Sequence, residues 1–240
     1  FDHIYLYDNE DVSTYATLLS EYAQYLTITH IPGNTYQIPV QYIAIGDFFE
    51  TFVKESTHVA HIDIDEFIVL KKHPSIKEFI AEYMTGDCAA IGMNWYFFGS
   101  SGHTEKSSDP VTQRFTKRQA HPDQHIKSLF DVSRTAGMPL CHCVIPQTSY
   151  YTKGTDGRII HGPFNPNGAT DVIQLNHYKT KTLPEFQYAR TRGRADIVSN
   201  MTPREDIVAS FKVFDINEVE DLTAQQFYME HCLASNRQPQ

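Results

Sequence analysis

The sequence predicts an α/β domain over about residues 1–195, followed by a helical extension over residues 196–240. Apolar, strand-like runs alternate with segments of helical periodicity through the first half of the chain, which favours a sheet with helices on its faces. Three N-capping patterns cluster near the C-terminus, and each predicts the start of a helix. A length of 240 residues with 41% hydrophobic residues suits one large domain or two small ones.

The first half of the chain is expected to alternate between strands and helices. The strands are runs rich in β-branched and aromatic residues, at residues 4–7, 26–31, 59–62 and 89–98. The helices are segments with apolar residues at helical spacing or with a capping box, at residues 12–25, 40–56 and 75–84. Because residues 1–7 are strongly apolar, we expect them to form an internal strand of a parallel sheet, with a preceding strand missing upstream of Phe1.

The second half is expected to be less regular. Short strands separated by polar loops are expected at residues 113–117, 126–132, 141–145 and 172–178, with a hairpin tip at residues 155–157. Helices are expected to begin at Thr182, Thr202 and Thr223, since each threonine is followed three residues later by Glu or Gln. The sequence shows no internal repeat and no obvious linker between domains.

The composition argues against several classes of partner. The formal net charge of −9 disfavours nucleic acid, whose phosphates need a basic surface. The apolar runs are shorter than the ~18 residues that cross a bilayer, so no transmembrane segment is expected in this chain. The four cysteines are irregularly spaced and predict no disulfide framework, which makes a reducing compartment the default expectation.

A run of acids follows the third predicted strand. Asp63 and Asp65 are two residues apart, so both carboxylates would point to the same side of an extended backbone. Converging carboxylates repel each other unless a cation neutralises them, and oxygen ligands suit Mn²⁺ or Mg²⁺, which keep positions open for phosphate oxygens. His177 ends another apolar strand and could complete such a metal site. The alternative is a solvated acidic turn and a structural histidine.

Other polar residues near strand ends are candidates for contacts with a nucleotide. Asp8 and Asn9 follow the first strand, where they could hydrogen-bond a ribose or a base edge or else cap the next helix. Lys127 lies in a strand-like segment and could neutralise a phosphate or face solvent. Arg192 is one of three arginines within residues 190–194 and could bind phosphate oxygens, with a solvated helix surface as the alternative.

An aromatic strand ends in a loop of small residues. Trp95 and Tyr96 could stack on a sugar ring, and residues 99–103 contain two glycines and two serines that let a substrate approach the backbone. His103 is the titratable member of this loop and could transfer a proton at neutral pH. The alternative is a hydrophobic core strand followed by a surface loop.

In their order as well as their type, these residues resemble glycosyltransferase family 92 and its relatives in the family 2-like group. The segments similar to the family's motifs are residues 1–9, 62–67 and 94–103, Lys127-Ser128, His142, Asn176-His177-Tyr178, Glu185-Phe186 and Arg192-Gly193. The resemblance covers about residues 1–195. It implies a GT-A fold, which is a Rossmann-like mixed sheet flanked by helices. It also implies a divalent metal, usually Mn²⁺, a nucleotide-diphosphate sugar as donor, and an inverting transfer.

With this resemblance, the sequence predicts a metal-dependent glycosyltransferase that moves a sugar from a UDP-sugar to a hydroxyl of a glycan acceptor. Asp65 and His177 would bind the metal, and Asp63 would contact the metal or the ribose. The remaining contacts to the nucleotide sugar are assigned to Asp8, Asn9, Tyr96, Lys127 and Arg192. The candidates for the general base that inversion requires are His103, Asp109 and Asp131.

Two other interpretations of the same residues stay open. A two-metal phosphatase or nuclease would use the same acids but would need further carboxylate clusters, which the sequence lacks. A catalytically inactive module that binds sugar or nucleotide would keep the fold, and donor hydrolysis with Mn²⁺ would separate it from the enzyme. The expected compartment is the cytoplasm, or the Golgi lumen if an N-terminal anchor has been removed.

Overall fold

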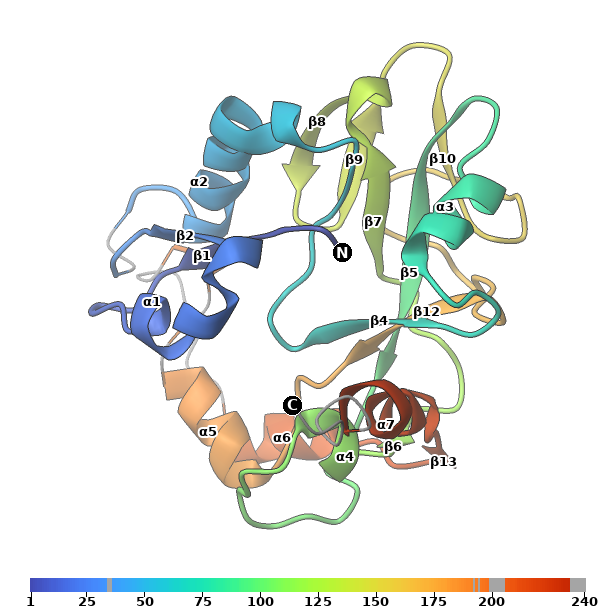
Figure 1. The fold of residues 1–240 in the computed structure, drawn as a ribbon. Coiled ribbons are helices and arrows are strands. Elements are labelled where there is room, and N and C mark those ends of the chain that lie inside the picture. The colour runs from blue at the N-terminus through green and yellow to red at the C-terminus, as the bar shows by residue number, and fades with distance from the viewer. Residues whose placement is uncertain (34–35, 192, 194, 199–205, 234–240) are drawn as a thin grey trace, which may run out of the picture.

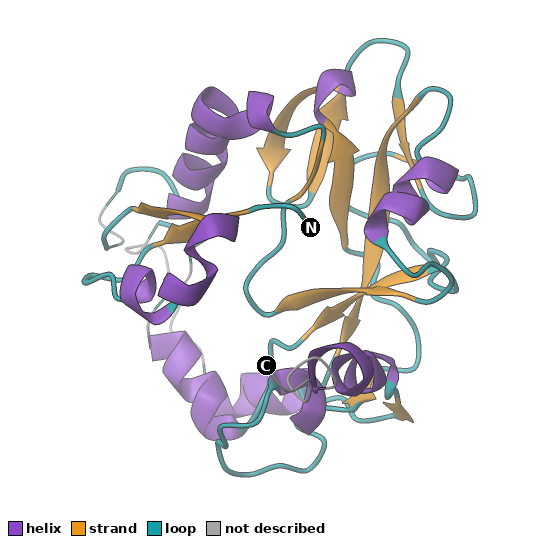
Figure 2. Ribbon diagram, viewed as in Figure 1, coloured by secondary structure: helices purple, strands orange, loops and turns teal. Residues whose placement is uncertain are grey.

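The chain forms a mixed α/β structure, as the sequence predicts (Figures 1 and 2). The structure is a computed structural model that describes the whole chain except residues 34–35, 192, 194, 199–205 and 234–240. A large sheet occupies the right-hand side of Figure 1, a small N-terminal unit the left, and the C-terminal helices the bottom. None of the helices in the described residues is both long and apolar enough to cross a membrane.

The large sheet has seven strands within the described residues and is built around β5 (Cys88–Phe97). The other strands are β3 (His58–Ala60), β4 (Glu66–Leu70), β7 (Ile126–Asp131), β10 (Tyr151–Lys153), β11 (Ile159–Ile160) and β12 (Ile173–His177). One edge of β5 pairs antiparallel with β7, and β7 pairs antiparallel with β3. The other edge pairs in parallel with β10 near the start of β5 and with β12 near its end. Antiparallel β11 and β4 extend the sheet beyond β10 and β12, so the sheet is mixed.

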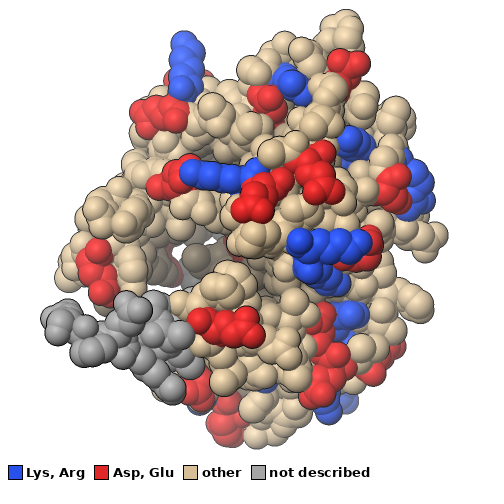
Figure 3. Space-filling view, turned by 45° about the vertical axis from the view of Figure 1, so that its right-hand side comes forward, with Lys and Arg blue, Asp and Glu red and all other residues tan. Residues whose placement is uncertain are grey.

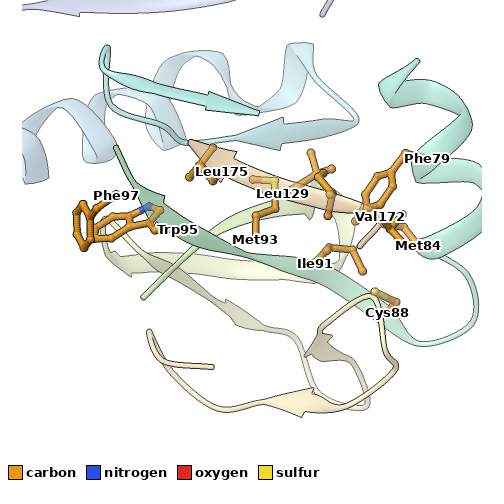
Figure 4. Packing of buried hydrophobic residues seen from close by; sticks show 11 residues of the cluster. Phe79, Met84, Cys88, Ile91, Met93, Trp95, Phe97, Leu129, Val172 and Leu175 are labelled. Carbon is orange, nitrogen blue, oxygen red and sulfur yellow. The ribbon is translucent and has the colours of Figure 1, made fainter. Parts of the chain in front are cut away.

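The main hydrophobic core lies on one face of this sheet. The side chains of Ile91, Met93, Trp95 and Phe97 alternate along β5 and belong to this core (Figure 4). Helix α3 (Ile76–Tyr83) covers the end where β5 begins, through the fully buried ring of Phe79. The capping box predicted at the start of α3 is confirmed, since the Ser75 side chain accepts a hydrogen bond from the Glu78 backbone N–H. Trp95 and Phe97 lie at the opposite end of β5, away from α3.

The N-terminal segment corrects one prediction. The strand β1 (Ile4–Asp8) pairs in parallel with β2 (Leu26–His30), but the two form a separate two-stranded sheet. The expected internal strand is therefore wrong: among the described residues β2 is the only partner of β1, and Ile4 is half-exposed. The contacts of Tyr5 explain the position of β1, because its ring packs against Phe48 and Phe52 and its hydroxyl donates to Glu55.

The helices of the N-terminal unit are less regular than predicted. The segment expected as one helix from 12 to 25 forms α1 (Tyr15–Leu18) and then a 3₁₀ helix (Ser20–Tyr25), with the break at Leu19. The segment expected from 40 to 56 begins as α2 (Val40–Asp47) and continues as a π-helix (Phe48–Phe52) and a 3₁₀ turn (Val53–Glu55). The predicted helical content is right, but the pitch changes along the segment.

The second half of the chain contains both confirmed and wrong predictions. The hairpin tip at 155–157 is confirmed, because it joins antiparallel β10 and β11. The strand expected at 113–117 is wrong: α4 (Val111–Arg114) occupies most of it, and β6 (Lys117–Arg118) begins only at its end. The strand expected at 141–145 is the second half of a hairpin, β8 (Thr135–Leu140) with β9 (Cys143–Pro146). The sequence predicts no strand at β4, because a run of acids is typical of the end of a strand rather than of the start of the next one.

The C-terminal part is helical and contacts the main sheet. It contains α5 (Leu183–Thr191), α6 (Ile207–Phe214), β13 (Val219–Glu220), α7 (Thr223–Phe227) and a π-helix (Tyr228–Leu233). The capping box at Thr182 is confirmed, whereas the one at Thr202 lies outside the described residues. Thr223 is itself the first residue of α7 rather than its cap. β13 pairs with β6, which ties this part to the loop after β5.

Candidate functional site

The acids Asp63 and Asp65 lie in a turn between β3 and β4 rather than on a strand. β3 ends at Ala60, and the Glu66 N–H donates to the Asp63 carbonyl oxygen at 2.9 Å, which closes the turn. The Glu66 carboxylate in turn accepts from the Asp63 N–H at 2.8 Å. The extended backbone expected here is therefore wrong, and the two aspartates turn toward different partners.

Asp65 faces the end of β12. Its Oδ1 lies 3.6 Å from Nε2 of His177, and its Oδ2 lies 4.0 Å from Nζ of Lys181. Its carbonyl oxygen accepts from the N–H of Tyr178 at 2.9 Å, which fastens the turn to β12. Burial by itself would raise the pKa of Asp65, but the contact with His177 and the charge of Lys181 hold it at about 2. The carboxylate is therefore ionised beside an imidazole at neutral pH.

Asp63 faces β7 and α2 instead. Its Oδ2 lies 3.1 Å from Nζ of Lys127, and its Oδ1 accepts from Nε2 of Gln41 at 3.0 Å. The Lys127 side chain is fully buried and lies 3.5 Å from the Glu66 carboxylate as well. Burial opposes its charge, yet the carboxylates of Asp63 and Glu66 raise the pKa of Lys127 above its ordinary value. A buried cation therefore faces the turn, and the phosphate-neutralising role assigned to Lys127 stays a prediction.

Glu66 links the two aspartates, and the sequence interpretation gave it no role. Its side chain is fully buried, with Oε2 toward Lys127 and Oε1 3.9 Å from Nδ1 of His177. Burial and the neighbouring Asp63 carboxylate raise the pKa of Glu66 to about 8. The one signal in the sequence that could have identified Glu66 is its place in the run of acids. As the first residue of β4, it has to face either the core or the turn.

Four polar atoms around this turn are buried without a hydrogen-bond partner in the described residues. They are Oε1 of Glu66, Nδ1 of His177, Nε2 of His61 and Nε1 of Trp95. The Trp95 ring contacts the rings of His177, at 4.6 Å, and His142, at 5.2 Å between centroids. A buried polar group without a partner costs about 1–3 kcal/mol, and such groups in one place indicate a binding site for a polar ligand.

The three side chains predicted to bind a metal do not all lie together, and the metal itself stays a prediction. Asp65 and His177 lie together, whereas Asp63 is engaged by Lys127 and Gln41. Within the described ranges, no three His, Cys, Asp or Glu side chains are already grouped as metal ligands. The structure therefore offers one carboxylate and one imidazole at this end of the sheet, with further positions left for a ligand.

The residues predicted to bind the nucleotide sugar are dispersed. Asp8 is buried at the end of β1, where its Oδ1 accepts from the Glu10 N–H, and Asn9 follows it. Tyr96 faces the opposite side of β5 from Trp95; its hydroxyl lies 3.0 Å from that of Thr170. Arg192 lies outside the described residues.

In the described part of the chain, the three residues predicted as general bases do not contact the turn that carries Asp63, Asp65 and Glu66. His103 is exposed and packs edge-on against Phe115. Asp109 is exposed and accepts from the Ser107 hydroxyl. Asp131 lies at the far end of β7, where it caps a 3₁₀ turn and pairs with Arg134 at 3.2 Å. These contacts are local and structural in kind, and the roles assigned to the three residues stay predictions.

The fold and the site together define an α/β protein that gathers carboxylates, imidazoles and a buried lysine at one end of a mixed sheet. The chain belongs to glycosyltransferase family 92, whose family model matches residues 1–161. This confirms the resemblance seen in the sequence and identifies a glycosyltransferase, which uses a sugar donor and an acceptor. A comparison with curated proteins finds no match. The matched range includes the acid turn and Lys127, whereas His177 lies beyond it.

Proposed function

We propose that this chain is a metal-dependent glycosyltransferase that transfers a sugar from a UDP-sugar to a hydroxyl of a glycan, with inversion at the sugar carbon. One observation carries the proposal: the ionised Asp65 lies beside His177 and the buried Lys127–Asp63–Glu66 group. The buried atoms without partners lie around the same turn. A diphosphate needs both a cation and hydrogen-bond donors, and this end of the sheet supplies both.

The side chains of Asp65 and His177 fit the coordination of a divalent cation of the Mn²⁺ or Mg²⁺ type. Such ions are commonly held by one or two carboxylates together with substrate phosphates and water, and an imidazole beside a carboxylate favours Mn²⁺ over Mg²⁺. Two ligands on one octahedral ion lie about 3 Å apart, close to the 3.6 Å between Asp65 Oδ1 and His177 Nε2. When bound, the metal would stabilise negative charge on the departing nucleotide diphosphate.

The residues around Asp65 would bind the phosphates and the sugar of the donor. Lys127 would place a positive charge near the phosphates, since its ammonium group is already held at the turn by Asp63 and Glu66. The Trp95 ring offers an apolar face beside His177, on which a sugar could rest. Because the turn is fastened by the Asp63–Glu66 hydrogen bonds and by Tyr178, these groups are ordered before a ligand arrives.

The distribution of surface charge also suits a small substrate better than nucleic acid. Acidic and basic side chains are intermixed on the face drawn in Figure 3, rather than separated into one basic surface. The chain as a whole carries a formal charge of −9. A diphosphate would therefore be recognised by local groups such as Lys127 and a metal, not by the overall field.

The test uses the protein with UDP and with a panel of UDP-sugars. We expect calorimetry to show UDP binding that requires Mn²⁺ and is abolished by EDTA. Release of free sugar or transfer to an oligosaccharide should follow the same metal dependence. His177→Gln should weaken binding by about 10-fold to 100-fold, while the exposed His161→Gln should not. UDP binding unaffected by EDTA would contradict the metal assignment, and binding without any turnover would favour the inactive binding module.

A further inference from the structure

An aspartate and a histidine form a hydrogen-bonded pair beside Trp95, outside the group of residues described above. Nδ1 of His125 lies 2.6 Å from Oδ1 of Asp123, and the same oxygen accepts from the His125 backbone N–H at 2.8 Å. Both side chains are partly exposed, at 35% for His125 and 27% for Asp123. A carboxylate that accepts from Nδ1–H leaves the lone pair of the imidazole on Nε2. That nitrogen has no hydrogen bond within the described residues.

The pair lies on the same side of the sheet as the acid turn. His125 precedes β7 directly, and its carbonyl accepts from the Trp95 N–H at 3.2 Å, so it stands opposite Trp95. Its ring is stacked on the indole at 5.1 Å, while His177 contacts the same indole at 4.6 Å. Lys127 follows two residues later and points to the same side. One tryptophan therefore separates the candidate donor-binding group from the Asp123–His125 pair.

A shallow, widely open cavity of about 500 Å³ lies beside Asp123. It is lined by residues 119 and 121–124, by Pro166 and Asn167, and by Ile216 and Glu218 of the C-terminal part. Amide and carboxylate side chains predominate in this lining, and neither lysine nor arginine contributes to it among the described residues. Such a lining suits hydroxyl groups, which donate and accept hydrogen bonds, and its two carboxylates with no lysine or arginine disfavour a phosphate or a carboxylate.

We propose that His125, positioned by Asp123, is the general base for an uncharged, hydroxyl-rich acceptor that lies in this cavity and extends past Asp123 and Gln124 to the neighbouring imidazole. The proposal rests on the glycosyltransferase function proposed above. Nε2 of His125 takes the proton of the acceptor hydroxyl as its oxygen bonds to the sugar carbon. The bond from that carbon to the diphosphate oxygen breaks, and its electron pair leaves with the diphosphate. The imidazolium then releases the proton to water, so acceptor and sugar nucleotide yield glycoside, nucleoside diphosphate and H⁺.

Two features distinguish this pair from the bases predicted from the sequence. The His125 ring contacts the same indole as His177, whereas the contacts of His103, Asp109 and Asp131 in the described residues are with Phe115, Ser107 and Arg134, away from the turn. The pair also has the orientation of a working dyad, in which the carboxylate fixes the tautomer and would stabilise the imidazolium. Two titratable side chains are packed against the His125 ring, Asp123 and, at 5.5 Å between centroids, His142.

The experiment compares His125→Gln, Asp123→Asn and the matched control His161→Gln. Three quantities are measured on the full chain: Mn²⁺-dependent UDP binding, the thermal unfolding midpoint, and transfer from a UDP-sugar to a panel of neutral and phosphorylated oligosaccharides. His125→Gln should lower kcat about 100-fold or more with UDP binding within a factor of two. Asp123→Asn should lower kcat by a smaller factor and shift the acid limb of the kcat/KM profile, which a purely structural role would not do.

Each outcome decides something. Wild-type turnover by His125→Gln, with unchanged folding, overturns the proposal. Equal losses of UDP binding and turnover in that variant would also overturn it, since the pair would then belong to the donor site. Preferential use of phosphorylated acceptors contradicts the assignment of the cavity. Failure of the wild type to bind UDP with Mn²⁺ would instead reject the proposed function, and the base assignment would fall with it.

Discussion

Two groups of buried charges in this protein differ in how completely their hydrogen bonds are satisfied. At the C-terminal side, the Arg114 guanidinium makes two bonds to the Glu185 carboxylate, at 3.0 and 2.8 Å. Asp221 accepts from Arg118 at 2.7 Å and from Gln174 at 3.0 Å, and Oε1 of Gln174 is the one atom of this group without a partner among the described residues. At the acid turn, by contrast, Glu66, His177 and Trp95 keep polar atoms without partners among the described residues.

The contrast separates a group that stabilises the fold from the group that binds the ligand in the proposed function. Burial would raise the pKa of Glu185 and of Asp221, but their hydrogen bonds with Arg114, Thr182, Arg118 and Gln174 hold both at about 2. Well-formed pairs of this kind tie α5 and the segment before α7 to the rest of the chain. The polar atoms without partners at the turn cost stability. Natural proteins retain such unfavourable groups where they serve function.

The largest effect is expected from breaking the buried ion pair between Arg114 and Glu185. Arg114→Ala leaves the Glu185 carboxylate buried without its cation, and loss of one partner of a buried pair costs about 3–5 kcal/mol. Denaturant unfolding should show this loss, whereas UDP binding by the folded fraction should be unchanged. Arg158→Ala, which removes an exposed pair with Asp156, is the matched control and should cost less than about 1 kcal/mol. Equal effects of the two variants would refute the distinction.

The next largest effect is expected at the acid turn and should have the opposite signature. Asp65→Ala removes the carboxylate beside His177 and should weaken Mn²⁺-dependent UDP binding by about 100-fold or more, since the loss of a residue that only hydrogen-bonds to a metal ligand already costs up to that much. The free energy of unfolding without ligand should fall by less than for Arg114→Ala, because the contacts of Asp65 with His177 and Lys181, at 3.6 and 4.0 Å, are longer than those between Arg114 and Glu185. Calorimetry and denaturant unfolding measure the two quantities. The exposed Asp171→Asn serves as the control. Large destabilisation with normal UDP binding would assign Asp65 to the structural group.

A smaller effect is expected at the loop that follows β5. The segment after α6 lies against Gly99, where an added methyl group would overlap the carbonyl oxygen of Ile216 and the side chain of Asn217. The Ser101 N–H donates to Asn217 Oδ1 at 2.7 Å, so this contact also orders the loop. Gly99→Ala should cost about 1–3 kcal/mol and make the C-terminal part more sensitive to limited proteolysis. Gly46→Ala, in open space within α2, should be neutral or stabilising; no difference between the two would show that the contact is not formed.

The smallest effect is expected from mild acid. Because the pKa values of Glu185 and Asp221 are lowered to about 2 in the fold, their contribution is complete above their unfolded pKa values and is lost as the pH falls toward 2. We expect a loss of about 1–2 kcal/mol between pH 5 and pH 3, allowing for solvent screening. Thermal unfolding across this range measures it. Glu185→Gln should be less stable at pH 7 but should lose less on acidification; a slope as steep as the wild type would exclude Glu185 as a source.

Much of the fold could be predicted because local patterns and tertiary packing agree there. The apolar run of β5, the capping boxes at Ser75 and Thr182 and the turn at residues 155–157 were all correctly identified. The run at 113–117 failed because a strand pattern of so few residues is equally compatible with one helical turn after Pro110. The separation of β1 and β2 from the main sheet was not predicted, because the sheet to which a strand belongs depends on long-range pairing, which composition does not report.

By itself, the sequence determined which chemical groups are available and in what order: the acid run, the lysine of β7, the histidine that ends β12, and the family to which they belong. Only the tertiary structure decided which of these groups contact one another. It turned Asp63 toward Lys127 and Asp65 toward His177, placed Glu66 between them, and brought His125 to the other side of Trp95. The reason is physical: spacing along the chain fixes directions only within one regular element, whereas partners from different strands meet according to pairing and register.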